Sequence, residues 1–164
     1  APRWLARGSD GTFWSMPTRF RWRLEHWDSI GKLLSTVERR PAWFTPYARD
    51  MAPDGNHPPE PVIRGFWLGP LDRLWVLGEV ADRTWRTGLA SHLPGSAEVI
   101  SDPDKVFDSV IESVDLRSGA SAAEAHFDPA YDGVAGAGTV VRVGLTTSGW
   151  KRVELFAVKF DGKH

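Results

Sequence analysis

The chain of 164 residues contains no cysteine. This absence excludes disulfides, thiolate metal ligands and a cysteine nucleophile. The sequence also lacks any run of about 18 apolar residues, the length that a membrane-spanning helix needs. The formal net charge is only −1, so the whole molecule has no general attraction to nucleic acid. We therefore expect no membrane span and no nucleic-acid partner.

Tyrosine is rare, with two residues, whereas tryptophan and phenylalanine are common, with nine and eight residues. Sixteen glycines and twelve prolines accompany them. Bulky aromatic side chains favour strands, and glycine and proline favour turns. The composition therefore predicts an all-β fold made of many short strands.

One pattern of short strand, turn and longer strand occurs three times, in residues 1–40, 62–130 and 131–164. A closing strand follows in the first two copies and is absent from the third. The longer strand repeats an apolar residue, a glutamate, any residue and an apolar residue. Its glutamates are Glu25, Glu112 and Glu154, and the preceding strand carries Trp14, Trp75 and Val141 at equivalent positions. We expect the repeated glutamates to be structural and both tryptophans to be buried.

Two segments interrupt the repeats. The spacing from Trp75 to Glu112 is 37 residues against 11 from Trp14 to Glu25, so the middle copy contains an insertion, roughly residues 81–105. This insertion is expected to form either a helical turn with a loop or a disordered excursion. Residues 41–61 contain six prolines and predict an extended, irregular crossing between the first two copies.

The first copy resembles a blade of the NHL type. The residues that match are Ser9-Asp10-Gly11-Thr12-Phe13-Trp14, followed by Arg23-Leu24-Glu25-His26-Trp27-Asp28-Ser29-Ile30-Gly31-Lys32-Leu33-Leu34. The whole chain is similar to the C-terminal blades of bacterial six-bladed β-propeller proteins, including the strands at 73–77 and 152–156. The resemblance implies one partial propeller domain of about three blades, each of up to four antiparallel strands, and the last without its outer strand. It also favours an exported or periplasmic bacterial protein.

Propellers close with typically four to eight blades, and a blade buries its faces only against its neighbours. We therefore interpret the chain as the C-terminal part of a longer protein, or as a half-ring that pairs with a second copy. In either case the isolated chain is expected to associate. The alternative is a compact β-sandwich in which the repeats are coincidental.

No catalytic residue and no metal ligand is predicted. The five histidines lack the spacing of a zinc pair, and the sequence has no Gly-x-Ser-x-Gly nucleophile motif. The segment Asp50 to His57 has the composition of a calcium loop, but Pro53 breaks the pattern. A row of arginines, Arg19, Arg21 and Arg23, alternates with aromatic and apolar residues. These arginines either bind phosphates or stacked bases, or cover apolar surface with their stems.

Two functions remain open. The favoured one is a non-catalytic binding or scaffold propeller that recognises a protein or a small molecule through its irregular loops and needs no cofactor. The candidate binding residues are Trp43, Phe44, Tyr47, Trp85, Arg86 and His92. The alternative is part of a propeller hydrolase of the lactonase or esterase type, with calcium as its expected metal and most ligands in other blades.

Overall fold

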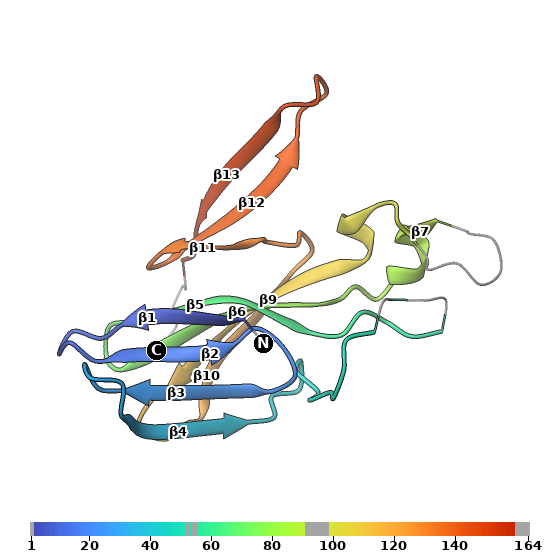
Figure 1. The fold of residues 1–164 in the computed structure, drawn as a ribbon. Coiled ribbons are helices and arrows are strands. Elements are labelled where there is room, and N and C mark those ends of the chain that lie inside the picture. Colours follow the sequence, from blue (N-terminus) through green and yellow to red (C-terminus); the bar gives the residue numbers. More distant parts are fainter. Residues whose placement is uncertain (1, 52, 54–55, 91–98, 160–164) are drawn as a thin grey trace.

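The computed structural model describes residues 2–51, 53, 56–90 and 99–159. These residues form three antiparallel sheets in chain order and one small two-stranded ribbon (Figure 1). Two short 3-10 turns occur, and the described ranges contain no α-helix. The prediction of an all-β fold is confirmed. No helix long and apolar enough to cross a membrane is present in this part of the chain.

The first sheet is a meander in the order β1-β2-β3-β4. Its turns use the residues that the sequence indicated. Asp10 Oδ1 accepts a hydrogen bond from the Thr12 amide at 3.1 Å, and Gly31 supplies a φ of 85°. The first strand was not predicted from the sequence. The four strands are Arg3–Arg7, Phe13–Pro17, Trp22–Trp27 and Leu33–Arg39.

The second sheet is also a meander, with the order β10-β9-β6-β5. Its strands are β5 at Val62–Gly69, β6 at Arg73–Ala81, β9 at Phe107–Asp115 and β10 at Ser121–Phe127. The insertion lies between β6 and β9, and its expected helical turn is present. Its elements are η1 at Trp85–Gly88, β7 at Leu89–Ala90, β8 at Val99–Ile100 and η2 at Pro103–Lys105.

The third sheet has three strands in the order β11-β12-β13. Its strands are β11 at Gly133–Gly136, β12 at Thr139–Leu145 and β13 at Lys151–Ala157. The β12–β13 hairpin projects away from the two four-stranded sheets (Figure 1). Among the described residues, nothing pairs with the outer side of β13.

Strand register places the repeated residues at equivalent positions. Trp14 is opposite His26, Trp75 is opposite Ser113, and Val141 is opposite Leu155. In each sheet the partner is the residue that follows the repeated glutamate, so the three-copy alignment corresponds to one shared sheet geometry.

The sheets pack one after another. Met16, Trp22 and Leu24 of the first sheet share a core with Val76 and Val110 of the second. The opposite face of the second sheet contributes Trp67, Leu77 and Ile111 to a core with Tyr131 and Val140. The first strand of each sheet contacts that of the next, β1 with β5 and β5 with β11. Each sheet therefore uses one face for the preceding sheet and the other for the following one.

Two local expectations are corrected. Trp14 and Trp75 are half-buried: each packs against the edge of one core, and the two rings stack on His26 and Trp67. Trp14 lies 4.0 Å from His26 between ring centroids. The arginine row is not a continuous strand: Phe20 has a φ of 76°, so β3 begins only at Trp22.

Candidate functional site

A cavity of about 1150 Å³ opens on the first sheet, and we call it the arginine cleft. It lies where β1, the turn before β3, β3 itself and the end of β4 meet the crossing segment at residues 46–48. Six arginines and two glutamates line it, an excess of four positive charges. They are Arg3, Arg19, Arg21, Arg23, Arg39 and Arg40, with Glu25 and Glu38.

Aromatic packing gives the cleft a fixed wall. Trp22 is 1% exposed, and the Arg39 guanidinium lies 5.1 Å from its ring centroid. Phe20 packs on Tyr47, whose amide donates to the Phe20 carbonyl at 3.1 Å and whose hydroxyl donates to the Pro61 carbonyl at 3.0 Å. Burial raises the pKa of the Tyr47 hydroxyl. These contacts hold the crossing segment against the first sheet.

Four of the six arginines are paired with acids. Arg3 and Arg23 approach the two oxygens of Glu25, at 2.5 and 2.7 Å. Arg23 also contacts Glu38 at 3.1 Å. The other two pairs are Arg19 with Asp50 at 2.6 Å and Arg39 with Glu112 at 2.7 Å. Most of the positive charge is therefore fixed in place by ion pairs.

Two of the six guanidinium groups that line the cleft have no partner in the described part of the chain. The exposed Arg21 and Arg40 form no hydrogen bond or ion pair with any residue that the structure describes. Two buried donors beside the cleft, Arg23 Nε and the indole Nε1 of Trp22 in the core between the first two sheets, have no hydrogen-bond acceptor among the described residues. A buried donor without an acceptor costs free energy, and guanidinium groups suit phosphate and carboxylate oxygens. The cleft can therefore accept an anion.

The repeated glutamates are ion-pairing positions rather than a ring of carboxylates. Glu112 is fully buried and accepts hydrogen bonds from Arg39 at 2.7 Å and from Trp43 Nε1 at 3.2 Å. Glu154 is partly exposed and pairs with Arg152 at 3.2 Å. The same sequence position therefore has different electrostatic surroundings in the three sheets.

The predicted loop residues fall into different environments. Trp43, Phe44 and Trp85 are buried, at 8%, 0% and 6% exposed, so the expectation that these rings form a binding surface is corrected. Trp43 and Phe44 fill the core between the first two sheets. Tyr47 does line the arginine cleft. The exposed Arg86 stacks over the Trp85 ring at 4.5 Å, and His92 lies outside the described residues.

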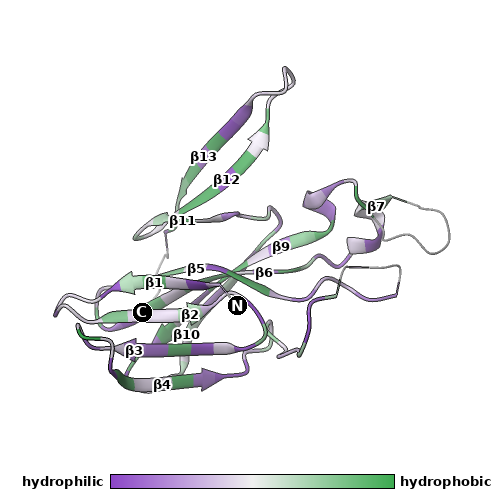
Figure 2. Cartoon of the chain, in the orientation of Figure 1, coloured by the Kyte–Doolittle hydropathy of each residue, from purple (hydrophilic) through white to green (hydrophobic). Residues whose placement is uncertain are grey.

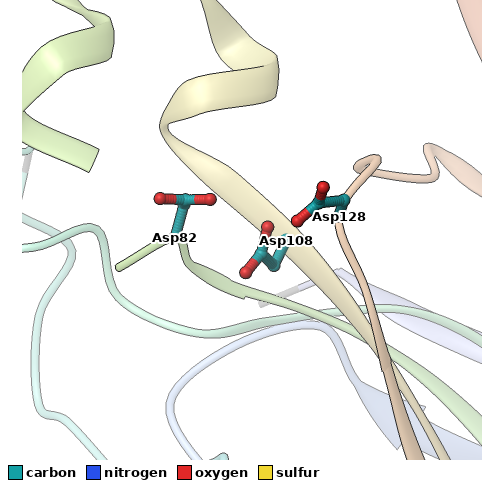
Figure 3. Close-up of side chains that lie close together, drawn as sticks. All are labelled: Asp82, Asp108 and Asp128. Atoms are coloured by element: carbon teal, nitrogen blue, oxygen red, sulfur yellow. The ribbon is translucent and has the colours of Figure 1, made fainter. Parts of the chain in front are cut away.

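A second cluster, not predicted from the sequence, consists of Asp82, Asp108 and Asp128 (Figure 3). Asp82 follows β6, Asp108 is near the start of β9, and Asp128 follows β10. One carboxylate oxygen of each residue lies within 4.8 Å of those of the other two. Burial, and then the nearby Asp82 carboxylate, raise the pKa of Asp108 to about 6. The cluster therefore retains a proton at mildly acidic pH.

Three carboxylate oxygens are a ligand type that calcium and magnesium accept. However, Asp82 Oδ1 is already engaged by Thr84, whose hydroxyl donates at 2.7 Å. The three residues are separated by 26 and 20 positions in the sequence and meet only because β6, β9 and β10 are neighbours. The sequence signal that could have found them is an aspartate just after β6, at the start of β9 and just after β10, three strands that are neighbours in the sheet.

Comparison of the chain with protein-family models, with curated proteins and with solved structures finds no match.

Proposed function

We propose that the chain is a non-catalytic binding domain built from β-propeller blades, and that it binds an anionic ligand in the arginine cleft. The supporting observation is the set of unused donors. Arg21 and Arg40 have no acid partner, and the buried Trp22 Nε1 has no acceptor, among the residues that the structure describes. An anion with several oxygens would bind the two unpaired guanidinium groups.

The blade interpretation is supported by sheet order and packing. Two four-stranded meanders are followed by a three-stranded one, and each sheet buries a face against the next. The first strands contact one another in turn, as the inner strands around a propeller axis do. In this arrangement β1, β5 and β11 lie on the inside and β4 and β10 on the outside.

The attraction of the cleft is local, because the whole chain has a net charge of only −1. Ligand binding should therefore weaken strongly as salt increases, since salt screens exposed charges over about 10 Å at 0.1 M. The paired arginines are held in position before the ligand arrives, which lowers the entropy lost on binding.

The test compares two double variants with the same change in charge. Arg21→Gln with Arg40→Gln removes the two unpaired arginines, and Lys32→Gln with Arg83→Gln removes two exposed cations outside the cleft. Inorganic pyrophosphate is the calorimetric probe, at low salt. We expect the first pair to weaken binding at least about tenfold, since a hydrogen bond to a charged group contributes about 1.5–3 kcal/mol. The control pair should change it little.

An NMR measurement on the same protein adds a local readout. The indole N–H signal of Trp22, assigned through Trp22→Phe, should shift when pyrophosphate is added. Equal weakening by both double variants, an unmoved Trp22 signal, or no pyrophosphate binding at low salt would each contradict the proposal.

The hydrolase alternative gains no support from the aspartate cluster. Asp82, Asp108 and Asp128 lie on or beside β6, β9 and β10, whereas the innermost strands of this arrangement are β1, β5 and β11. The cluster therefore lies away from the channel in which the resemblance would place a hydrolase centre.

A further inference from the structure

The outer strand of the third sheet differs from its counterparts. β3 is covered by β4 and β9 by β10, but the equivalent β13 has no strand on its outer side in the described part of the chain. A strand with an open edge presents unpaired backbone groups and is a template for another strand.

The ladder to β12 shows which backbone groups are available. Thr146 N donates to the Trp150 carbonyl, and Asp132 N donates to the Val141 carbonyl on the opposite side of β12. Hydrogen-bonded and non-hydrogen-bonded pairs alternate along an antiparallel ladder. Lys151 and Val153 lie opposite Leu145 and Val143 in non-hydrogen-bonded pairs of this ladder. The backbone N–H and C=O groups of Lys151, Val153 and Leu155 therefore point away from β12, towards the open edge.

The side chains along this edge are apolar and exposed. Val153 and Leu155 are 62% and 63% exposed, and Val143 and Leu145 on the same face of the hairpin are 46% and 71% exposed. Figure 2 shows apolar residues along β12 and β13, on the hairpin that projects from the rest of the molecule. The described residues place no other element over this face.

The sequence of β13 is complementary to itself. If two copies pair antiparallel about Val153, Arg152 of each lies opposite Glu154 of the other. Lys151 of each copy then lies opposite Leu155 of the other. The backbone N–H and C=O groups that face the open edge form hydrogen bonds between the two copies at this pair and between the two central valines. Pairing about Glu154 would instead oppose two carboxylates, so charge favours the register on Val153 over that one.

We propose that two copies of the chain associate through their β13 strands, antiparallel and centred on Val153, to form a continuous six-stranded sheet. The proposal does not depend on the arginine cleft, which lies on the first sheet. The small contact predicts a reversible, concentration-dependent dimer.

The first test uses proline at position 153 in the full chain. The backbone N–H of Val153 faces the open edge and does not bond to β12. Because proline lacks this N–H, Val153→Pro should keep the ladder between β12 and β13 and remove the dimer. Val153→Thr retains the N–H and the branched shape, and it should still dimerise. Sedimentation measures association, and circular dichroism with thermal melting checks that both variants fold.

The second test uses charge and does not depend on proline. In this register R152E alone places an acid opposite Glu154 of the other copy, and E154R alone places a base opposite Arg152. Each single variant should therefore weaken dimerisation at least about tenfold. The double variant R152E with E154R restores both attractions and should dimerise again. A mixture of the two single variants should form a heterodimer, because each acid of one variant then lies opposite a base of the other.

A parent chain that stays monomeric at all concentrations overturns the proposal, and so does a dimer that survives Val153→Pro. Single charge variants that dimerise as well as the parent would also overturn it, because the register about Val153 would then be wrong.

Discussion

The ion pair between Arg39 and Glu112 connects the first two sheets, and its loss should be costly. Glu112 is fully buried on β9, while Arg39 at the end of β4 is 15% exposed and donates to it at 2.7 Å. Arg39→Met keeps most of the stem that covers Trp22 but removes the charge. The carboxylate would then retain only the hydrogen bond from Trp43 at 3.2 Å. Leaving one member of a buried pair uncompensated costs about 3–5 kcal/mol.

Arg152→Met is the matched control, because it removes the partner of the equivalent Glu154. There the two side chains are 58% and 34% exposed, and exposed pairs contribute about 0–1 kcal/mol. Urea unfolding at neutral pH measures both variants. Domains have stabilities of about 5–15 kcal/mol, so Arg39→Met should lower the unfolding midpoint strongly and Arg152→Met only slightly. Equal losses in the two variants would refute the assignment of different roles to the repeated glutamates.

Two further predictions concern the second sheet. Gly78→Ala should destabilise by about 1–3 kcal/mol, because the added Cβ would overlap the Trp43 ring and lie 2.8 Å from Val110; Gly144→Ala on β12, with open space around it, should not. Thermal melting distinguishes the two. For Asp108, the raised pKa of about 6 means that its contribution to stability is present at low pH and lost as the pH rises through about 6. Asp108→Asn should therefore stabilise at pH 8, by at most about 1 kcal/mol because solvent screens the cluster, and make little difference at pH 4. A benefit of equal size at both pH values would contradict this.

The strands and turns were predictable where local chemistry determines them. Asp10, Asp28 and Gly31 shape turns within a few residues of themselves, and the spacing of the glutamates reflects the shared register of β3, β9 and β13. The first strand was missed because Arg3–Arg7 is short and is defined only by its pairing with β2. The left-handed backbone at Phe20 was missed because its alternating neighbours favour an extended strand.

The candidate sites could not be predicted in the same way, because they depend on contacts between distant segments. Arg39 reaches the cleft because β4 pairs with β3 and places it opposite Trp22. The aromatic residues of the crossing were expected on the surface because loops usually are, but Trp43 and Phe44 fill the space between two sheets. Burial of a loop side chain is decided by which sheets it crosses, and the sequence of the loop does not contain that information.

The location of the arginine cleft follows from the serial packing of the sheets. Glu112 lies on the face of the second sheet that meets the first sheet, and its ion-pair partner is Arg39 of the first sheet. Glu25 occupies the same position of the first sheet, but no sheet precedes it among the described residues, and it is paired with Arg3 and Arg23 of its own sheet.

No sheet of the described part of the chain covers that face, which is rich in positive charge. Residues 131–159 contain four basic side chains and two acidic ones, so a second copy docking its third sheet there would oppose positive charge with positive charge. Closure of a half-ring by a second copy is therefore disfavoured at this face, and an anion is the better occupant. Pyrophosphate at the first sheet and a second copy at β13 should for this reason bind independently, and saturating the cleft should leave the dimerisation constant unchanged. A dimerisation constant that changed with pyrophosphate would place both events on one surface and contradict this separation.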